Sequence, residues 1–301
     1  MFLLEKNKNL YEKLIQHSLY KLGYVSQVVN IKKTEYRNSL SICSKILLQF
    51  NSKLGGISYK IDFYDNKIYQ NLMIVGVSSS HITNKRTGIG MVATINDSFT
   101  NFFNKEDIIN EENKKQISFN IKSFLEKAFE IYRQENKLFP KNLIIYRQGV
   151  SLEQKYYLRN EIKQINNLCE YKNISFYYIL VNKKLKYKFF EKGKKEFCNP
   201  SPNLLVLDGI TNKNFFEFYI QPQEVTEGSA IPTCYHVAYG NLNYLELIPK
   251  LTFDLCSLHF NWNGKIRVPH VISAAKKLSR IAAKYMPENI NSYFRLGKEY
   301  L

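Results

Sequence analysis

Cysteine is scarce in this 301-residue chain, and its five copies are scattered rather than clustered. They are Cys43, Cys169, Cys198, Cys234 and Cys256. No Cys-x-x-Cys pair or Cys/His cluster occurs, so the sequence predicts neither a zinc site nor a disulfide framework. An odd number of scattered cysteines instead favours a reducing compartment inside the cell.

Long apolar runs are missing as well. No stretch of the sequence approaches the ~20 residues that a membrane-spanning helix needs. The N-terminal letters MFLLEKNKNLYEK become charged too early for a secretory signal peptide. We therefore expect a soluble, intracellular protein of the cytoplasm or nucleus, without a membrane partner.

Acidic residues are outnumbered, with 26 Asp and Glu against 43 Lys and Arg and a formal net charge of +17. This excess suits a polyanion such as nucleic acid, because neutralising phosphates releases their counterions. A basic, solvated surface without a partner would give the same total, so charge alone does not decide. The 45% hydrophobic content predicts a folded chain. Its 301 residues are enough for one large domain or two small ones.

Alternating strand and helix patterns predict an α/β fold. Continuous apolar runs predict buried strands, whereas apolar residues three or four apart predict helices. The predicted strands are 72–77, 88–95, 142–147, 174–181, 204–207, 215–220 and 234–239. After a first N-terminal helix, the predicted helices are 38–51, about 121–132, 151–167, 243–260 and 270–286. The charged segment 104–116 is expected to be an exposed loop.

Seven sequence blocks, in order from about residue 70 to the end, carry a more specific signal. They read NLMIVGV, LIIYRQGVS, ILVNKKLKYKFF, NPSPNLLVLDGIT, FEFYIQPQEVTEGSAIPTCYHVAYG, LTFDLCSLHFNWNGKIRVP and RLGKEYL. Together they resemble the PIWI domain of Argonaute proteins, and the Piwi clade in particular. Upstream, LGYVSQVV and LLQFNSKLGG resemble the end of the preceding MID domain. The resemblance implies an RNase H-like PIWI fold over residues 69–301 and a partial MID-like segment over residues 1–68.

In that family four residues hold the Mg²⁺ ions that cut RNA, and this chain departs from the pattern at each. The corresponding positions are Ser78, Ile117, Gln148 and Lys276. Mg²⁺ prefers negatively charged oxygen ligands, which a hydroxyl, a sec-butyl group, an amide and an ammonium do not supply. Lys276 also places positive charge where the metals would lie. The resemblance therefore implies a protein with no metal cofactor and no slicing activity.

Other candidate ligands leave an alternative open. His81 and His270 lie close to these positions in the sequence, and Glu111 or Glu112 fits under another alignment. One His and one Glu would still leave both aspartate positions empty. An active Mg²⁺-dependent nuclease is thus the least favoured interpretation.

The resemblance further implies a pocket for the 5′ phosphate of a guide strand. The matching residues are Tyr11, Gln27, Gln49 and Lys53, together with the C-terminal carboxylate of Leu301. Ile15 stands where the family has a lysine, so one phosphate contact is missing. A tyrosine can stack on a base and a lysine can contact a phosphate, which suits a 5′ nucleotide.

A second matching stretch follows the strand predicted at 174–181. Here the family grips the guide backbone, and the corresponding residues are Lys183, Lys184 and Lys188, with Arg267 as a weaker candidate. Lysines in this place would contact phosphates as point charges without reading sequence. The alternative is a solvated turn between two strands.

These features favour a catalytically inactive, Piwi-like protein that binds RNA, either a small guide RNA or a guide/target duplex, in RNA silencing. One alternative is a protein-interaction module of an Argonaute pathway, because a truncated MID exposes sheet edges that a protein partner would cover. Another is a non-functional gene fragment. The mutually consistent strand, helix and turn signals argue against the fragment.

Overall fold

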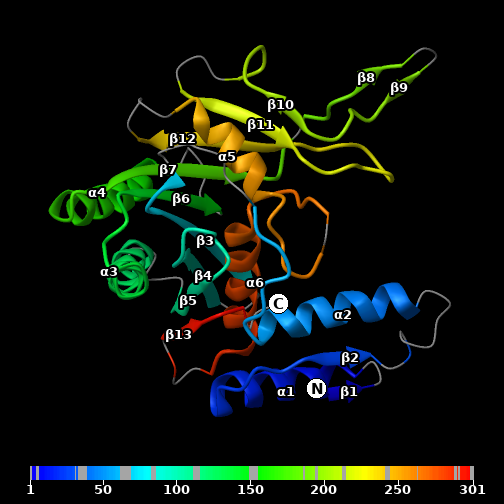
Figure 1. Ribbon diagram of the computed structural model, residues 1–301, viewed down its shortest axis with the longest axis vertical. Coiled ribbons are helices and arrows are strands. Elements are labelled where there is room, and N and C mark those ends of the chain that lie inside the picture. The colour runs from blue at the N-terminus through cyan, green and yellow to red at the C-terminus, as the bar shows by residue number, and fades with distance from the viewer. Residues whose placement is uncertain are drawn as a thin grey trace.

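Nine strands of the described residues form one mixed sheet at the centre of the molecule, which confirms the α/β prediction (Figure 1). The computed structural model describes residues 2–4, 7–30, 32, 39–61, 69–82, 86–110, 116–148, 155–185, 187–193, 196–211, 215–240, 245–262, 264–287, 290 and 292–298. The strands lie in the order β10 (Leu204–Val206), β11 (Glu217–Gln221), β12 (Thr233–Tyr239), β7 (Ser175–Asn182), β6 (Asn142–Gln148), β3 (Leu72–Ile82), β4 (Arg86–Thr94), β5 (Phe102–Asn110) and β13 (Ser292–Leu296). The β3–β6 and β6–β7 pairs are parallel, and the other neighbours are antiparallel.

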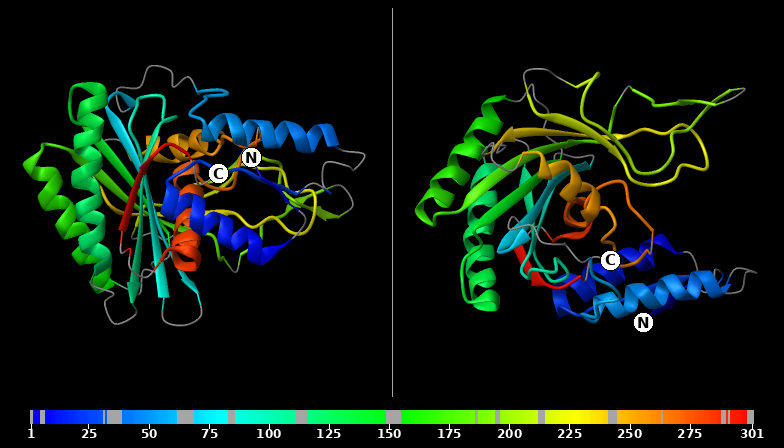
Figure 2. Two further views of the ribbon diagram at one scale, coloured as in Figure 1. Left: turned by 90° about the horizontal axis from the view of Figure 1, so that it is seen from below. Right: turned by 45° about the horizontal axis from the view of Figure 1, so that its top comes forward.

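Helices cover both faces of this sheet (Figure 2). On one face lie α3 (Gln116–Asn136) and α4 (Lys155–Tyr171), and on the other lie α5 (Leu247–Leu255) and α6 (His270–Tyr285). Side chains alternate along a strand, so each strand contributes to both cores. In β3, Met73 and Val75 join the α3/α4 core, whereas Leu72 and Ile74 join the α5/α6 core.

Helix α6 lies unusually close to the sheet because two glycines of β4 face it. A Cβ atom at Gly88 would collide with the backbone carbonyl of Ser279, and one at Gly90 would collide with that of Ala275. A hydrogen bond of 2.6 Å between the hydroxyls of Ser80 and Ser279 adds a buried polar link. The position of α6 is therefore fixed by backbone contact.

The N-terminal segment packs beside the end of α6. It consists of β1 (Phe2–Leu4), α1 (Lys8–Ile15), the π-helix η1 (Gln16–Leu22), β2 (Val28–Asn30) and α2 (Ser39–Lys53). Strands β1 and β2 form a separate parallel pair, and a small hairpin of β8 (Glu191–Lys192) and β9 (Phe197–Cys198) lies at the far end of the molecule (Figure 1). Ile15, Leu19 and Tyr20 pack against Ala282 and Met286 of the C-terminal part. The boundary near residue 68 stays a prediction.

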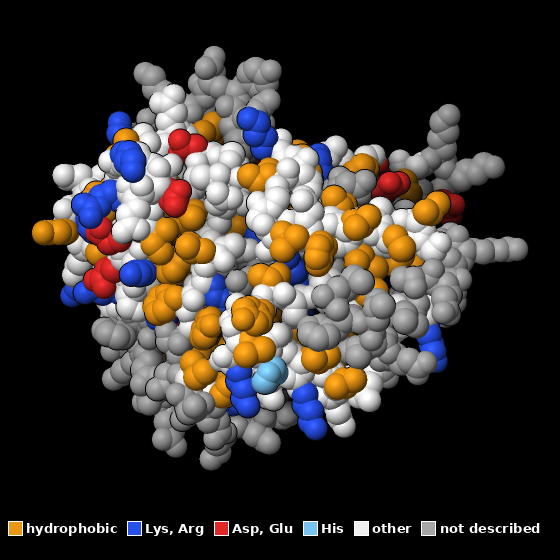
Figure 3. Space-filling view, turned by 60° about the horizontal axis from the view of Figure 1, so that its bottom comes forward, with side chains coloured by type: hydrophobic (Ala, Val, Ile, Leu, Met, Phe, Trp, Pro, Cys, Tyr) orange, Lys and Arg blue, Asp and Glu red, His pale blue; other side chains and the backbone are white. Residues whose placement is uncertain are grey.

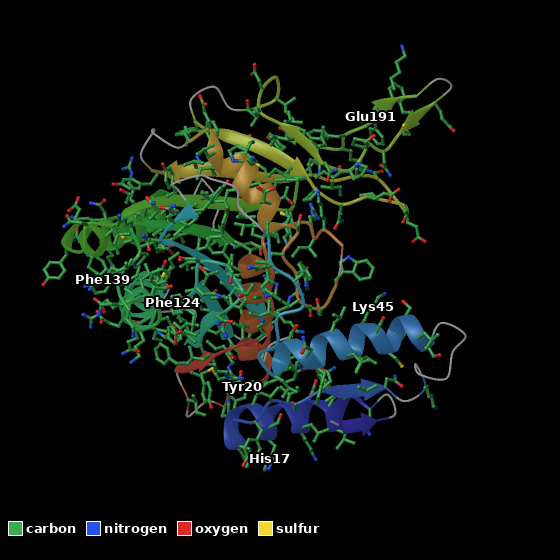
Figure 4. All side chains as sticks on the ribbon, in the orientation of Figure 1. His17, Tyr20, Lys45, Phe124, Phe139 and Glu191 are labelled. Carbon is green, nitrogen blue, oxygen red and sulfur yellow. The ribbon has the colours of Figure 1, made fainter. Side chains whose placement is uncertain are left out.

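The prediction of an exposed loop over 104–116 is wrong for residues 104–110, which belong to β5, and residues 111–115 lie outside the described residues. Lys105 pairs with Asp107 at 3.1 Å, and both side chains are buried. Glu106 accepts a hydrogen bond of 2.5 Å from the Tyr20 hydroxyl and pairs with Arg295 at 3.2 Å. Figure 4 shows Tyr20 between the N-terminal helices and the sheet. Buried charges are tolerated when paired, and both partners of Glu106 lie far from it in the sequence.

Other predicted elements differ mainly in length. Strand β3 continues to Ile82 instead of ending at Val77, and the helix expected at 243–260 is the shorter α5. Helices α2 and α6 and strands β6 and β7 agree with their predicted ranges within two residues. None of the helices in the described part of the chain has both the length and the hydropathy that crossing a bilayer requires.

Candidate nucleic-acid interface

The parallel pairing of β3 and β6 brings together two of the four positions that the sequence predicts to be substituted metal positions. Ser78 and Gln148 form the last pair of this ladder, so their side chains lie on the same face of the sheet. That face carries α6, because Ile74 and Gly76, at alternate positions before Ser78, contact the α6 side. The Ser78 Oγ and the Gln148 Oε1 are buried, and neither has a hydrogen-bond partner among the described residues. At this end of the ladder, two polar atoms therefore lack a partner within the described part of the chain.

A third of these four predicted positions, Lys276, reaches the same place from α6. The Lys276 Nζ donates a hydrogen bond of 2.8 Å to the carbonyl of Ser79. Burial lowers the pKa of Lys276, and repulsion from Arg280 and Lys184 lowers it further. Ile117 lies in the first turn of α3, and its side chain is outside the described residues.

Lys183 follows β7 directly and adds a further positive charge. Val181 of β7 is in register with Gln148, which places the end of β7 beside the unsatisfied pair. The Arg267 Nη2 donates to the carbonyl of Lys183 at 2.7 Å, and its Nε donates to the Thr233 hydroxyl at 3.2 Å. Burial lowers the pKa of Lys183 to about 8, and Arg267, Lys276 and Arg280 add repulsion.

We name these cations the basic cluster. Its members are Lys183, Lys184, Arg267, Lys276 and Arg280. They come from the segment after β7, the segment before α6, and α6 itself. Lys183 is half-buried, whereas Lys184 and Lys188 are exposed. Within the described residues, Lys188 makes no hydrogen bond or ion pair with the basic cluster.

Alternative metal ligands do not gather at this place. His81 is exposed and bonds to the Thr87 hydroxyl at 2.7 Å, while the His270 ring packs against Phe260. Burial lowers the pKa of His270 well below its usual value, with further repulsion from His259 and two lysines. Glu111 and Glu112 lie outside the described residues. Among the residues that the structure does describe, no group of three or more His, Cys, Asp or Glu side chains could hold a metal ion.

A pocket of about 180 Å³ lies between the N-terminal helices and α6. Four of the five residues predicted for the 5′-phosphate site line it: Tyr11, Gln27, Gln49 and Lys53. The Lys53 Nζ donates to the carbonyl of Ser26 at 2.7 Å, and the Gln27 amide donates to the Gln49 side chain at 3.2 Å. The structure thus brings these side chains together from α1, the segment before β2, and α2. Leu301 lies outside the described residues.

Two contacts with the C-terminal part hold α2 beside this pocket. The Ser52 hydroxyl donates to the carbonyl of Phe260 at 2.9 Å. Lys45, labelled in Figure 4, lies over the Trp262 ring at 4.5 Å from its centroid. Lys53 is therefore carried on a helix that is anchored at two points.

Lys277 also lines the pocket, together with Ile15, although no sequence motif marks it as a pocket residue. It follows Lys276 in α6, and successive helical residues point about 100° apart. The Lys276 side chain accordingly joins the basic cluster, whereas the Lys277 side chain points to the pocket. Burial lowers the pKa of Lys277. Only the packing of α6 against α1 reveals this residue, because the sequence shows no more than a Lys-Lys pair on a helix.

Comparisons with known proteins agree with this architecture. A family model described as "Piwi domain" matches residues 1–287. Protein argonaute-3 of Drosophila melanogaster is 32% identical over 270 residues, which cover 88% of this chain and 30% of that protein. The chain thus spans about 30% of the length of this relative.

Solved structures show the same fold. The crystal structure of Drosophila Piwi superposes with a TM-score of 0.83 at 26% identity, covering 99% of this chain and 41% of that one. Kluyveromyces polysporus Argonaute, crystallised with a guide RNA, gives a TM-score of 0.81 at 20% identity. That match covers 94% of this chain and 37% of the yeast chain, and at this identity it shows the fold alone.

Proposed function

This chain belongs to the Piwi domain family, and from that membership we propose that it binds RNA without cutting it. The family relationship is consistent with RNA-guided silencing, in which a small guide strand or its duplex with a target is the partner. The basic cluster beside Ser78 and Gln148 carries the proposal. Positive charge in this place opposes the binding of Mg²⁺ and favours the phosphates of a nucleic acid.

The absence of slicing follows from the side chains at the substituted positions. A two-metal nuclease needs carboxylates that draw both cations to the reacting phosphate. Ser78 and Gln148 offer neutral oxygens, and Lys276 brings an ammonium that repels a metal. The protein would therefore hold a strand in place and leave it intact.

The pocket that Lys53 and Lys277 line would receive the 5′ end of the strand. Two ammonium groups suit a terminal phosphate, and the exposed ring of Tyr11 offers a surface on which the first base can stack. Lys277 supplies the second cation in a pocket where Ile15 replaces the lysine that the family pattern has. We therefore expect a preference for RNA that carries a 5′ phosphate.

Filter binding of 5′-phosphorylated RNA over a series of salt concentrations tests the proposal. Each phosphate that the protein neutralises should lower log K by about 0.7 per tenfold rise in salt for a single strand. The Lys53→Ala/Lys183→Ala variant should bind more weakly, and the loss should be larger for 5′-phosphorylated than for 5′-hydroxyl RNA. No binding at low salt, or an affinity that is indifferent to salt, would overturn the proposal.

An apolar stripe on α2 favours a second function in protein contact. Leu40 and Leu47 are 86% and 67% exposed, and their spacing of seven residues with Phe50 one turn further places them on one helix face. Figure 3, which turns the α1 and α2 side forward, shows exposed hydrophobic side chains interspersed with Lys and Arg. Recovery of the protein from cells with a protein partner, but without nuclease-sensitive RNA, would support this function over RNA binding.

A further inference from the structure

Five cations of one sign converge in the basic cluster from three different segments. Lys183 is repelled by Arg267, Lys276 and Arg280, and Lys276 is repelled by Arg280 and Lys184. No Asp or Glu is among the described groups that shift the pKa of either lysine. Like charges held this close raise the free energy of the unoccupied protein, and a bound anion relieves that cost.

Polar atoms that have no partner in the described ranges lie beside these cations. The Ser78 side chain is 0% exposed, and its hydroxyl has no hydrogen-bond partner among the described residues. The Gln148 Oε1, in register with it, has none there either. A serine hydroxyl and, after rotation of its amide, a glutamine NH₂ group both donate hydrogen bonds to an oxyanion. Buried polar groups are rarely left unsatisfied, so the pair points to a ligand.

Not every cation of the basic cluster would touch this ligand directly. Arg267 already donates to two backbone carbonyls and to the Thr233 hydroxyl, so its guanidinium mainly fixes the segment that carries Lys183. Lys276 uses one of its three N–H groups on Ser79 and keeps two for a ligand. Lys183 and Lys276 are therefore the principal contacts.

We propose that the basic cluster, with Ser78 and Gln148, binds an internal phosphodiester of a bound RNA directly, without a metal ion. This inference rests on the proposed function, since it names the part of the RNA that this place recognises. The terminal phosphate has its own pocket, built from Lys53 and Lys277 on the other side of α6. Because the terminal phosphate binds there, the phosphate that the basic cluster binds would be one within the strand. The phosphate would occupy the position where the family pattern has metal ligands.

Binding of a short 5′-phosphorylated RNA in EDTA, compared with Mg²⁺, tests this site. The Lys183→Ala/Lys276→Ala variant should bind at least about tenfold more weakly, as expected for lost hydrogen bonds to a charged group. For this variant, the slope of log K against the logarithm of the salt concentration should become shallower by roughly 1.4, because two phosphate contacts are lost. The wild-type affinity should be no weaker in EDTA than in Mg²⁺, because Mg²⁺ bound to the RNA competes with the lysines.

A matched control removes the same charge from the opposite face of the sheet. Lys127 of α3 and Lys163 of α4 are exposed, and the Lys127→Ala/Lys163→Ala variant should keep the wild-type affinity. Thermal unfolding of each variant separates lost binding from lost folding. If the Lys183→Ala/Lys276→Ala protein unfolds early, Lys184→Ala replaces it, because Lys184 is exposed and its substitution leaves the core intact.

Replacing single internal linkages of the RNA by neutral methylphosphonates locates the contact. The wild type should lose affinity at one internal linkage, and the Lys183→Ala/Lys276→Ala variant should not lose it there. If the wild type binds RNA but the cluster variants bind equally well, the inference is wrong and the proposed function stands. The inference is also wrong if binding needs Mg²⁺. If the wild type binds no RNA at all, both are overturned.

Discussion

Two consecutive lysines in α6 divide their charges between two sites. Lys276 bonds to the β3 backbone beside Ser78, and Lys277 lines the pocket next to Lys53. At the scale of single residues, the account therefore rests on where each ammonium points. The sequence indicated a substituted metal position at Lys276 but gave no role to Lys277, since that role depends on the packing of α1 against α6.

Ile15→Lys should strengthen the binding of 5′-phosphorylated RNA. The new ammonium would enter the pocket that Ile15 lines and restore the lysine of the family pattern. We expect a gain of about tenfold for 5′-phosphorylated RNA, from one hydrogen bond to a charged group, and little change for 5′-hydroxyl RNA. Filter binding with both RNAs measures the difference. An equal gain for both would show that the pocket does not receive the terminal phosphate.

RNA affinity should fall as the pH rises through about 8, the value to which burial lowers the pKa of Lys183. Above that pH Lys183 loses its proton, and a phosphate loses one contact. Lys183→Arg should keep its affinity, because guanidinium stays charged throughout this range. Burial also lowers the pKa of Lys298 to about 8, so only the difference between the two proteins reports on Lys183. Parallel pH profiles would contradict this assignment.

The lowered pKa of Lys183 should make the protein more stable as the pH rises, although it makes RNA binding weaker. The unfolded chain keeps the Lys183 proton up to its ordinary pKa of 10.5, whereas the folded chain releases it near 8. Between these values the unfolded state binds more protons, so the free energy of unfolding should rise with pH from this residue. Urea unfolding of wild type and Lys183→Met at several pH values measures that contribution. A difference that stays constant across this range would show that the pKa of Lys183 is not lowered.

At the scale of secondary-structure elements, apolar runs predicted the apolar strands well, but the strand that carries buried charges was not predicted. Strands β6 and β7 are continuous apolar runs, and their predicted ranges hold. Strand β5 was missed because its sequence, FFNKEDIIN, places charges at buried positions. Glu106 is satisfied by Tyr20 and Arg295, whose positions only the fold reveals, and Lys105 pairs with Asp107. Pairing across distant segments is the information that a local pattern does not contain.

Gly90→Ala should destabilise the contact between β4 and α6. The added Cβ would collide with the carbonyl of Ala275 and lie 2.8 Å from the Leu278 Cβ. Overpacking of this kind costs about 1–3 kcal/mol in the free energy of unfolding. Displacing α6 would move both of its lysines, so RNA affinity should fall in parallel. A urea midpoint and an affinity equal to those of the wild type would show that α6 does not depend on this close approach.

Glu161→Leu should lower the free energy of unfolding by about 3–5 kcal/mol, because it leaves a buried arginine without its counter-charge. Arg147 and Glu161 are 1% and 4% exposed and pair at 3.3 Å, and the Tyr178 hydroxyl also donates to Glu161. Lys122→Ala breaks an exposed pair with Glu126 and serves as the control, with an expected cost of at most ~1 kcal/mol. Similar urea midpoints for the two variants would refute the importance of the buried pair.

At the scale of the whole molecule, the sheet brings into contact sites that are distant in the sequence. The α/β class and the four pocket residues were predicted from the chain alone, and the fold gathers those residues in one pocket. The basic cluster was predicted only as separate lysines and an arginine, because its convergence depends on the ends of β7 and β6 and on the position of α6. The central claim is that a Piwi fold holds RNA here with cations of its own.

One incubation tests that claim most directly. A 5′-phosphorylated RNA duplex is mixed with the protein in Mg²⁺ or in EDTA, and both the bound fraction and the RNA length are measured. The account predicts binding at low salt that is no weaker in EDTA than in Mg²⁺, weaker binding at high salt, and RNA of full length throughout. Shortened RNA in Mg²⁺ that EDTA abolishes, or no bound RNA at low salt, would contradict it.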